Sequence, residues 1–129
     1  MIRQSFFIME VFYMIYLCIA CMSVFGALCR YSISLLLHAP MYTIIVNLIG
    51  AFALGYCTTY FKRLSCSALI KTGVTTGFLG SFTTFSALSK DVADLYLAHH
   101  YLSLIIYYSI SIFGGIICSA IGLKWGDRN

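Results

Sequence analysis

The residues best suited to chemistry lie in one uncharged stretch, Gly77-Phe-Leu-Gly80-Ser-Phe-Thr83-Thr84-Phe85-Ser86. This stretch places glycines and hydroxyl side chains within a segment whose other residues are apolar enough for a membrane-spanning helix. Because a bilayer holds no water to satisfy free backbone groups, non-helical backbone survives there only where protein buries it or where it lines a site. A broken helix offers carbonyl oxygens to a cation and N–H groups or hydroxyls to an anion. The stretch therefore predicts an ion site.

Two more polar residues lie at or inside apolar segments. Arg30 follows a long uncharged run, so it is either an anchor that reaches the membrane surface or a cation that faces a vestibule. Asn47 lies deep in Thr43-Ile-Ile-Val-Asn47-Leu-Ile-Gly50. Its amide either forms an interhelical hydrogen bond, worth about 0.6 kcal/mol, or donates to an anion. Position alone favours the interhelical bond for Asn47 and decides nothing for Arg30.

Ser103, Tyr107 and Ser111 follow one another at a spacing of four residues. This spacing aligns three hydroxyls along one face of a helix. Such hydroxyls either bond to neighbouring carbonyls or form a ladder of neutral donors for a small anion. Both interpretations stay open for this face.

Composition shows which elements must position these residues. The 129 residues are 61% hydrophobic and 9% charged, which is typical of membrane proteins. A span needs about 20 apolar residues. The chain therefore predicts one all-α membrane domain over 1–129, with four transmembrane helices. We expect these helices at about 11–36, 41–61, 68–97 with a break at 77–86, and 101–123.

The basic residues lie unevenly about these predicted spans. The side that carries both termini and the 62–71 loop holds Arg3, Lys62, Arg63, Lys71, Lys124 and Arg128, whereas the other side holds Arg30 and Lys90. Six against two predicts both termini in the cytoplasm. Because the basic residues are scattered at span ends, they do not indicate nucleic-acid binding.

The chain does not resemble an enzyme. It contains no phosphate loop, no metal-ligand cluster and no pair of nucleophile and base. Its six cysteines lie within or beside apolar spans, where they behave as small hydrophobes. No carboxylate is expected at the centre of a span, and a proton-coupled exporter of this size needs one.

Three motifs in order resemble the small bacterial fluoride channels (Fluc, also called CrcB). They are Gly26-Ala-Leu-Cys-Arg30-Tyr31, the Thr43–Gly50 motif and the Gly77–Ser86 stretch. The resemblance implies an antiparallel, dual-topology dimer in the cell membrane, with two narrow pores through which fluoride leaves the cytoplasm passively. It also implies a structural sodium ion at the dimer centre, which is not transported. Backbone carbonyls of Gly80 and Thr83 from each subunit would hold this ion.

The same resemblance implies roles for individual side chains. Arg30 matches a vestibule arginine, Asn47 a pore asparagine, and Phe85 the first of two pore phenylalanines. The ring edge of a phenylalanine carries partial positive charge and can face fluoride. The implied fluoride pathway comprises Asn47, Phe85, Thr84, Ser86, Tyr107, Ser111 and Thr43.

Two features depart from the family pattern. The second pore phenylalanine is replaced by Leu88, and the charge bias favours one fixed orientation in the lipid. Both favour a heterodimer, in which an oppositely oriented homologous subunit supplies the inverted half. The alternatives are a conducting homodimer, a non-conducting subunit that completes its partner's pore, and a small four-helix multidrug exporter.

Overall fold

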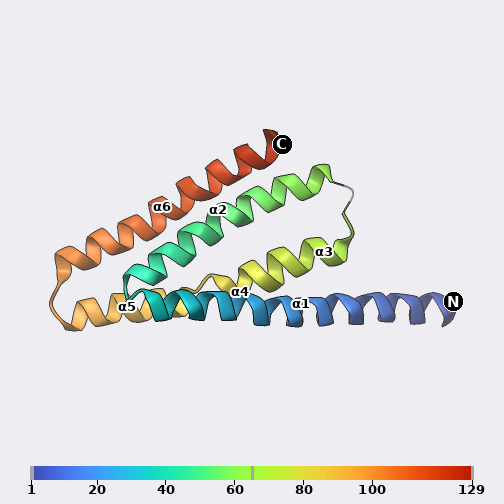
Figure 1. Ribbon diagram of the computed structural model, residues 1–129, viewed down its shortest axis with the longest axis horizontal. Coiled ribbons are helices and arrows are strands. Elements are labelled where there is room, and N and C mark those ends of the chain that lie inside the picture. Colours follow the sequence, from blue (N-terminus) through green and yellow to red (C-terminus); the bar gives the residue numbers. More distant parts are fainter. Residues whose placement is uncertain (1, 65, 129) are drawn as a thin grey trace.

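The computed structural model is all-helical and describes residues 2–64 and 66–128, with side chains described from Met9 onward. Figure 1 shows an elongated bundle whose segments alternate in direction. The elements are α1 (Ile2–Leu36), α2 (Met41–Arg63), α3 (Ala68–Thr72), the π-helix η1 (Gly73–Leu79), α4 (Gly80–Phe82), α5 (Phe85–Leu97) and α6 (Tyr101–Arg128).

Three helices are long and apolar enough to cross a membrane: Met9–Leu36, Met41–Arg63 and Tyr101–Arg128. Little of their surface is buried, and large apolar side chains such as Leu36, Leu102 and Phe113 are exposed. In water such a surface would drive aggregation, so its natural surroundings are lipid chains. The chain is a helical membrane protein.

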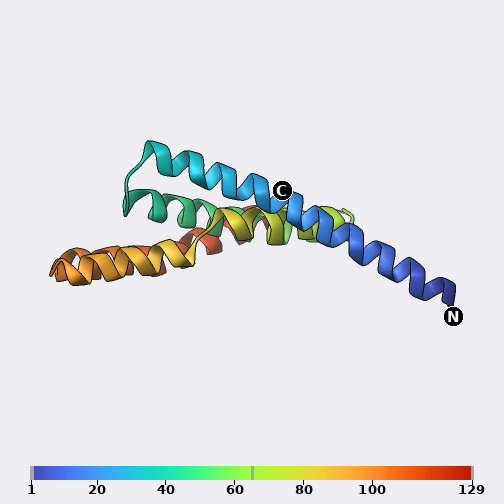
Figure 2. The ribbon, with the colours of Figure 1, turned by 90° about the horizontal axis from the view of Figure 1, so that it is seen from below.

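The elements from α3 to α5 form a bent fourth segment: α3, η1 and α4 pack against α1, whereas α5 diverges from α1 and packs against α6 (Figures 1 and 2). The 68–97 segment was predicted to break within 77–86. In the structure, helical geometry is lost at Thr83 and Thr84, which are both extended (ψ 156° and 115°). The preceding turns of η1 are wider than those of an α-helix, a local distortion that is common near functional sites.

Glycines let the helices approach closely. Helices α2 and α6 run side by side in the same direction, and a Cβ atom on Gly55 or Gly122 would collide with the carbonyl of Ser119 or Phe52, respectively. A Cβ atom on Gly26 of α1 would meet the carbonyl of Phe78 in η1 in the same way. Small residues are the usual basis of helix packing in lipid, where the hydrophobic effect no longer draws helices together. The bundle therefore depends on backbone contacts, and the second view shows how α1 crosses the other helices (Figure 2).

We predict that Gly122→Ala destabilises the bundle by about 1–3 kcal/mol, because the new methyl group meets backbone atoms that cannot rotate away. Thermal unfolding in detergent measures the effect. Gly115→Ala is the matched control on the same helix, since no heavy atom lies within 4 Å of the position of its Cβ. Equal stability of the two variants would contradict this packing.

Candidate functional site

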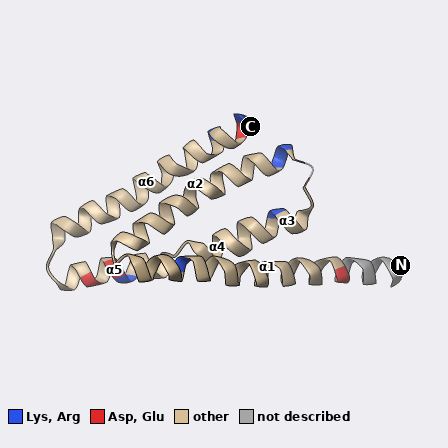
Figure 3. Ribbon diagram, in the orientation of Figure 1, with Lys and Arg blue, Asp and Glu red and all other residues tan. Residues whose placement is uncertain are grey.

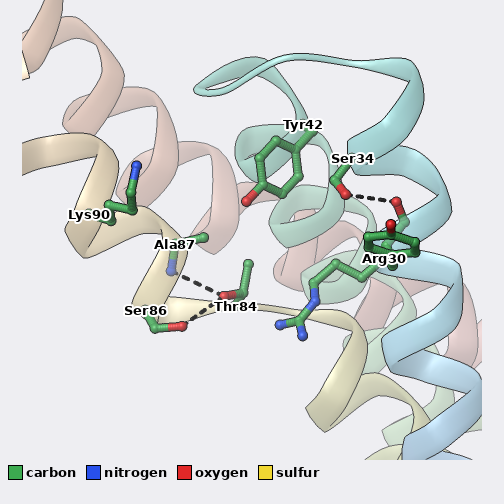
Figure 4. A pocket seen from close by; sticks show the side chains of 8 residues that line it. Arg30, Ser34, Tyr42, Thr84, Ser86, Ala87 and Lys90 are labelled. Carbon is green, nitrogen blue, oxygen red and sulfur yellow. Dashed lines mark hydrogen bonds between the residues drawn. The ribbon is translucent and has the colours of Figure 1, made fainter. Parts of the chain in front are cut away.

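A cationic hollow of about 430 Å³ opens beside the broken segment, and we call it the vestibule. In Figure 4 the Arg30 guanidinium points toward the segment that carries Thr84, and Lys90 lies further along α5. The lining residues are Arg30, Tyr31, Ser34, Tyr42, Thr84, Ser86, Ala87 and Lys90. Two cations and several hydroxyls, without a lining carboxylate, create a potential that concentrates small anions.

The two cations differ in their partners. Lys90 forms an ion pair with Asp94 at 2.8 Å, one helical turn further along α5. Among the described side chains, Arg30 takes part in no ion pair, so its charge is fully available to the vestibule. Of the two interpretations that the sequence left open for Arg30, the structure favours the cation that faces a vestibule. Lys90 was not expected at the site, because the sequence alone does not show which residues of α5 line the same hollow as Arg30 of α1.

A second hollow, which we call the groove, lies on the other side of the break. It has a volume of about 340 Å³ and is lined by Asn47, Gly50, Ala51, Leu54, Thr75, Leu79, Gly80, Thr83, Thr84 and Phe85. Thr84 lines both hollows, so the vestibule and the groove meet at the extended residues. The Phe85 side chain is 80% exposed, and no other element covers it.

Asn47 pairs with the backbone of the break. Its Oδ1 accepts from the Thr84 N–H at 2.8 Å, and its Nδ2 donates to the Thr84 carbonyl at 3.0 Å. This is the interhelical bond that position favoured, although its partner is backbone. An amide nitrogen carries two hydrogens, so one N–H of Asn47 remains for another acceptor.

The carbonyls of Gly80 and Thr83 lose their usual helical donors at this break. In an unbroken helix the N–H of Thr84 would donate to Gly80, and the N–H of Ala87 would donate to Thr83. Here the Thr84 N–H goes to Asn47, and the Ala87 N–H donates to the Thr84 hydroxyl at 3.2 Å. These are the two carbonyls that the family resemblance assigned to sodium. Neutral oxygens of this kind are what a hard cation binds.

Three polar residues form a buried cluster between α2, α5 and α6. The Tyr107 hydroxyl donates to Asp91 Oδ2 at 2.9 Å, and both side chains are about 5% exposed. Thr43 is fully buried, and its hydroxyl has no hydrogen-bond partner among the described residues. Asp91 was not among the predicted site residues, because the sequence analysis considered carboxylates only at the centres of spans and Asp91 lies near the end of the predicted 68–97 span. The signal was its spacing of three residues from Leu88, which places the two on one face of α5.

The three hydroxyls of α6 are not equivalent. Tyr107 is buried, Ser111 is half-buried and Ser103 is exposed. The Ser111 hydroxyl donates to the carbonyl of Tyr107 at 2.9 Å, within its own helix. In this conformation the hydrogens of Tyr107 and Ser111 are therefore both engaged, so this face presents oxygen atoms rather than free donors.

A bent helical membrane protein with a cationic vestibule and a pair of freed carbonyls belongs to the class of small ion-transport proteins. Comparison with known proteins gives the family. Residues 17–123 match the family described as CrcB-like protein, Camphor Resistance (CrcB), and the chain belongs to this family. This confirms the resemblance that its motifs indicated.

Relatives with established names cover most of the chain. It is 39% identical over 121 residues to "Fluoride-specific ion channel FluC 1" of Bacillus cereus, with 88% of each chain aligned. It is 37% identical over 112 residues to "Fluoride-specific ion channel FluC" of Acinetobacter baylyi, which covers 83% of this chain and 89% of the relative. Both relatives are named as ion channels.

We predict that Tyr107→Phe destabilises the protein by about 1–3 kcal/mol, because it leaves the buried Asp91 carboxylate without its donor. Thermal unfolding in detergent measures the change. Tyr108→Phe is the matched control, since Tyr108 is the next residue on α6 and its side chain is 47% exposed. A Tyr107→Phe variant as stable as the control would show that the bond contributes nothing.

Proposed function

We propose that this chain is a subunit of a fluoride-specific channel. Fluoride would leave the cytoplasm through it passively, which lowers intracellular fluoride and confers resistance. The observation that carries the proposal is the meeting of a cationic vestibule with a groove at Thr84, in a chain whose relatives are named as fluoride channels. Beyond the two cations the vestibule is lined by neutral side chains, and the groove lining holds no charged side chain, so the path can attract an anion without trapping it.

Each pathway residue has a chemical task in this proposal. Arg30 and Lys90 draw fluoride into the vestibule by charge. The hydroxyls of Thr84 and Ser86, which lie 3.3 Å apart, and the spare N–H of Asn47 replace part of its water shell. The edge of the Phe85 ring offers weak positive charge beyond them. Thr43, Tyr107 and Ser111 would continue the path, once the Tyr107 hydroxyl turns from Asp91 toward the ion.

An inverted second subunit would complete the pore. Support comes from what one chain leaves uncovered, namely the groove and the exposed Phe85 ring. A Cβ atom on Gly80 would lie 3.9 Å from the Thr75 carbonyl and near nothing else. Within the described part of one chain, then, no close contact requires glycine there. A requirement for Gly80 would have to come from a partner that packs against it.

The freed carbonyls support a structural sodium ion in the same assembly. Gly80 and Thr83 from two subunits would supply four neutral oxygens, which suits a small hard cation. Among the described residues no group of three acidic, histidine or cysteine side chains could hold a metal ion. A bound ion would hold the two broken segments together by electrostatic attraction.

The composition of the dimer and its orientation are part of the proposal. Figure 3 shows both signs at each end of the bundle, with basic residues predominating at the end that carries the C-terminus and the 62–71 loop. This bias favours cytoplasmic termini and one orientation, and hence a heterodimer with an oppositely oriented homologue. Leu88, in place of a second phenylalanine, favours a weakened aromatic half-site. The alternative is a non-conducting subunit that only completes its partner's pore.

Fluoride efflux from liposomes tests the proposal. We expect efflux when this chain is reconstituted with an inverted homologous partner, and little efflux from the chain alone. Chloride efflux, measured in the same vesicles, is the control for selectivity. Efflux from the chain alone would establish a homodimer and overturn the heterodimer. Absence of fluoride efflux under both conditions would contradict the channel itself.

We predict that Phe85→Ile lowers fluoride efflux about tenfold, which corresponds to about 1.4 kcal/mol in the barrier, because it removes the aromatic edge from the path. Efflux of the assembly that conducts is the measurement. Phe113→Ile on α6 is the matched control, since this ring is also exposed but lies away from both hollows. Unchanged efflux in Phe85→Ile would favour the non-conducting role for this subunit.

A further inference from the structure

Asn47 and Gly50 lie on one face of α2 and both contact the break. Gly50 makes room for it, because a Cβ atom there would collide with the Thr83 methyl group. Asn47, one turn earlier, bonds to both backbone groups of Thr84. Residues three apart on a helix share a face, so one surface of α2 fixes two consecutive residues of the break.

Fixing Thr84 in this way changes the hydrogen bonding of a third group, the Gly80 carbonyl. With Thr84 N–H bonded to Asn47 Oδ1, the Gly80 carbonyl loses the donor that would close the next helical turn. The backbone just before the break does keep its helical bond, since the Thr83 N–H donates to the Leu79 carbonyl at 3.1 Å. Without the amide of Asn47, the same geometry could continue by one residue and the Thr84 N–H could return to Gly80.

We propose that Asn47 is the positioning residue of the cation site, and that it acts by holding the Thr84 N–H away from the Gly80 carbonyl. This inference rests on the proposed function, because it takes the Gly80 and Thr83 carbonyls as the ligands. It gives Asn47 a task beyond lining the fluoride path. The Thr84 hydroxyl does the same for Thr83, since it accepts the Ala87 N–H that would otherwise close on that carbonyl.

In this arrangement one side chain, that of Asn47, would affect both the fluoride path and the cation site. Thr84 lines both the vestibule and the groove, so its backbone orientation sets the hydroxyl that faces the anion. The same orientation decides whether the Gly80 carbonyl is free. Fluoride passage and cation binding are therefore coupled through one residue of backbone, and Asn47 holds that residue.

The test is the sodium dependence of thermal stability, measured on the assembly that conducts fluoride. A ligand that binds only the folded state raises stability with its concentration, so a sodium titration against N-methylglucamine gives a midpoint for binding. We expect Asn47→Ala to shift this midpoint about tenfold to higher sodium, because sodium must then displace about one hydrogen bond, from the Thr84 N–H to the Gly80 carbonyl. Radioactive sodium binding at equilibrium provides a second readout that does not depend on flux.

Controls separate positioning from general loss of structure. Ser23→Ala removes another side-chain bond to the same broken segment, from Ser23 Oγ to the Gly77 carbonyl at 3.3 Å, and should leave the sodium midpoint unchanged. Thr84→Val removes the second diverting group and should shift the midpoint, whereas Thr84→Ser keeps the hydroxyl and should restore it. The Thr84 pair keeps the test decisive if Asn47→Ala does not fold.

The outcomes separate this inference from the proposed function. If wild-type protein conducts fluoride and is stabilised by sodium, but Asn47→Ala and Thr84→Val keep the wild-type midpoint, the positioning role is overturned while the channel stands. Reduced fluoride efflux in Asn47→Ala at an unchanged midpoint would make Asn47 a pathway residue only. Wild-type protein that conducts without any response to sodium would overturn the cation site, and this inference with it.

Discussion

The pairing of Asn47 with the backbone of Thr84 is the interaction on which the rest of the site depends. An extended residue inside a membrane segment exposes an N–H and a C=O that lipid cannot satisfy. One amide side chain satisfies both, at 2.8 and 3.0 Å. The Thr84 hydroxyl then caps α5, and the helix restarts at Phe85. The break is thus stabilised by bonds from neighbouring side chains, and it can persist where a free backbone could not.

A break held in this way gives the groove and the vestibule different chemistry. Gly80 and Thr83 line the groove, and their carbonyls are left without helical donors. Toward the vestibule, the hydroxyls of Thr84 and Ser86 lie beside two cations. Carbonyl oxygens suit a hard cation, whereas hydroxyls and positive charge suit an anion. In the proposed channel, these two extended residues would therefore separate a cation site from an anion path.

The single chain leaves the proposed cation site incomplete. Its freed carbonyls number too few to surround a cation, the groove is open, and the Phe85 ring stands exposed. The buried Asp91–Tyr107 pair, in contrast, is complete within the chain. A partner would therefore complete the groove side of the break, while the cluster between α2, α5 and α6 forms as each subunit folds.

The sequence by itself determined the environment and the place of the break. Long uncharged stretches require lipid, and the glycines and hydroxyls of 77–86 interrupt a helix that is otherwise apolar. The three motifs indicated the family, because their residue types and spacing can be recognised without knowledge of the fold. They also placed Arg30, Asn47 and Thr84 among the candidates.

The tertiary structure alone decided which groups meet. Asn47 and Thr84 are 37 residues apart, and Asp91 and Tyr107 are 16 apart, so no local pattern pairs them. The bend brings Lys90 to the vestibule, and the packing of α2 against the break turns Asn47 toward backbone. Hydropathy fixes which segments enter the membrane, because it acts on each segment separately. Side-chain partners depend on how the segments pack, and in this bundle that packing is set by the close approach of backbones at a few glycines.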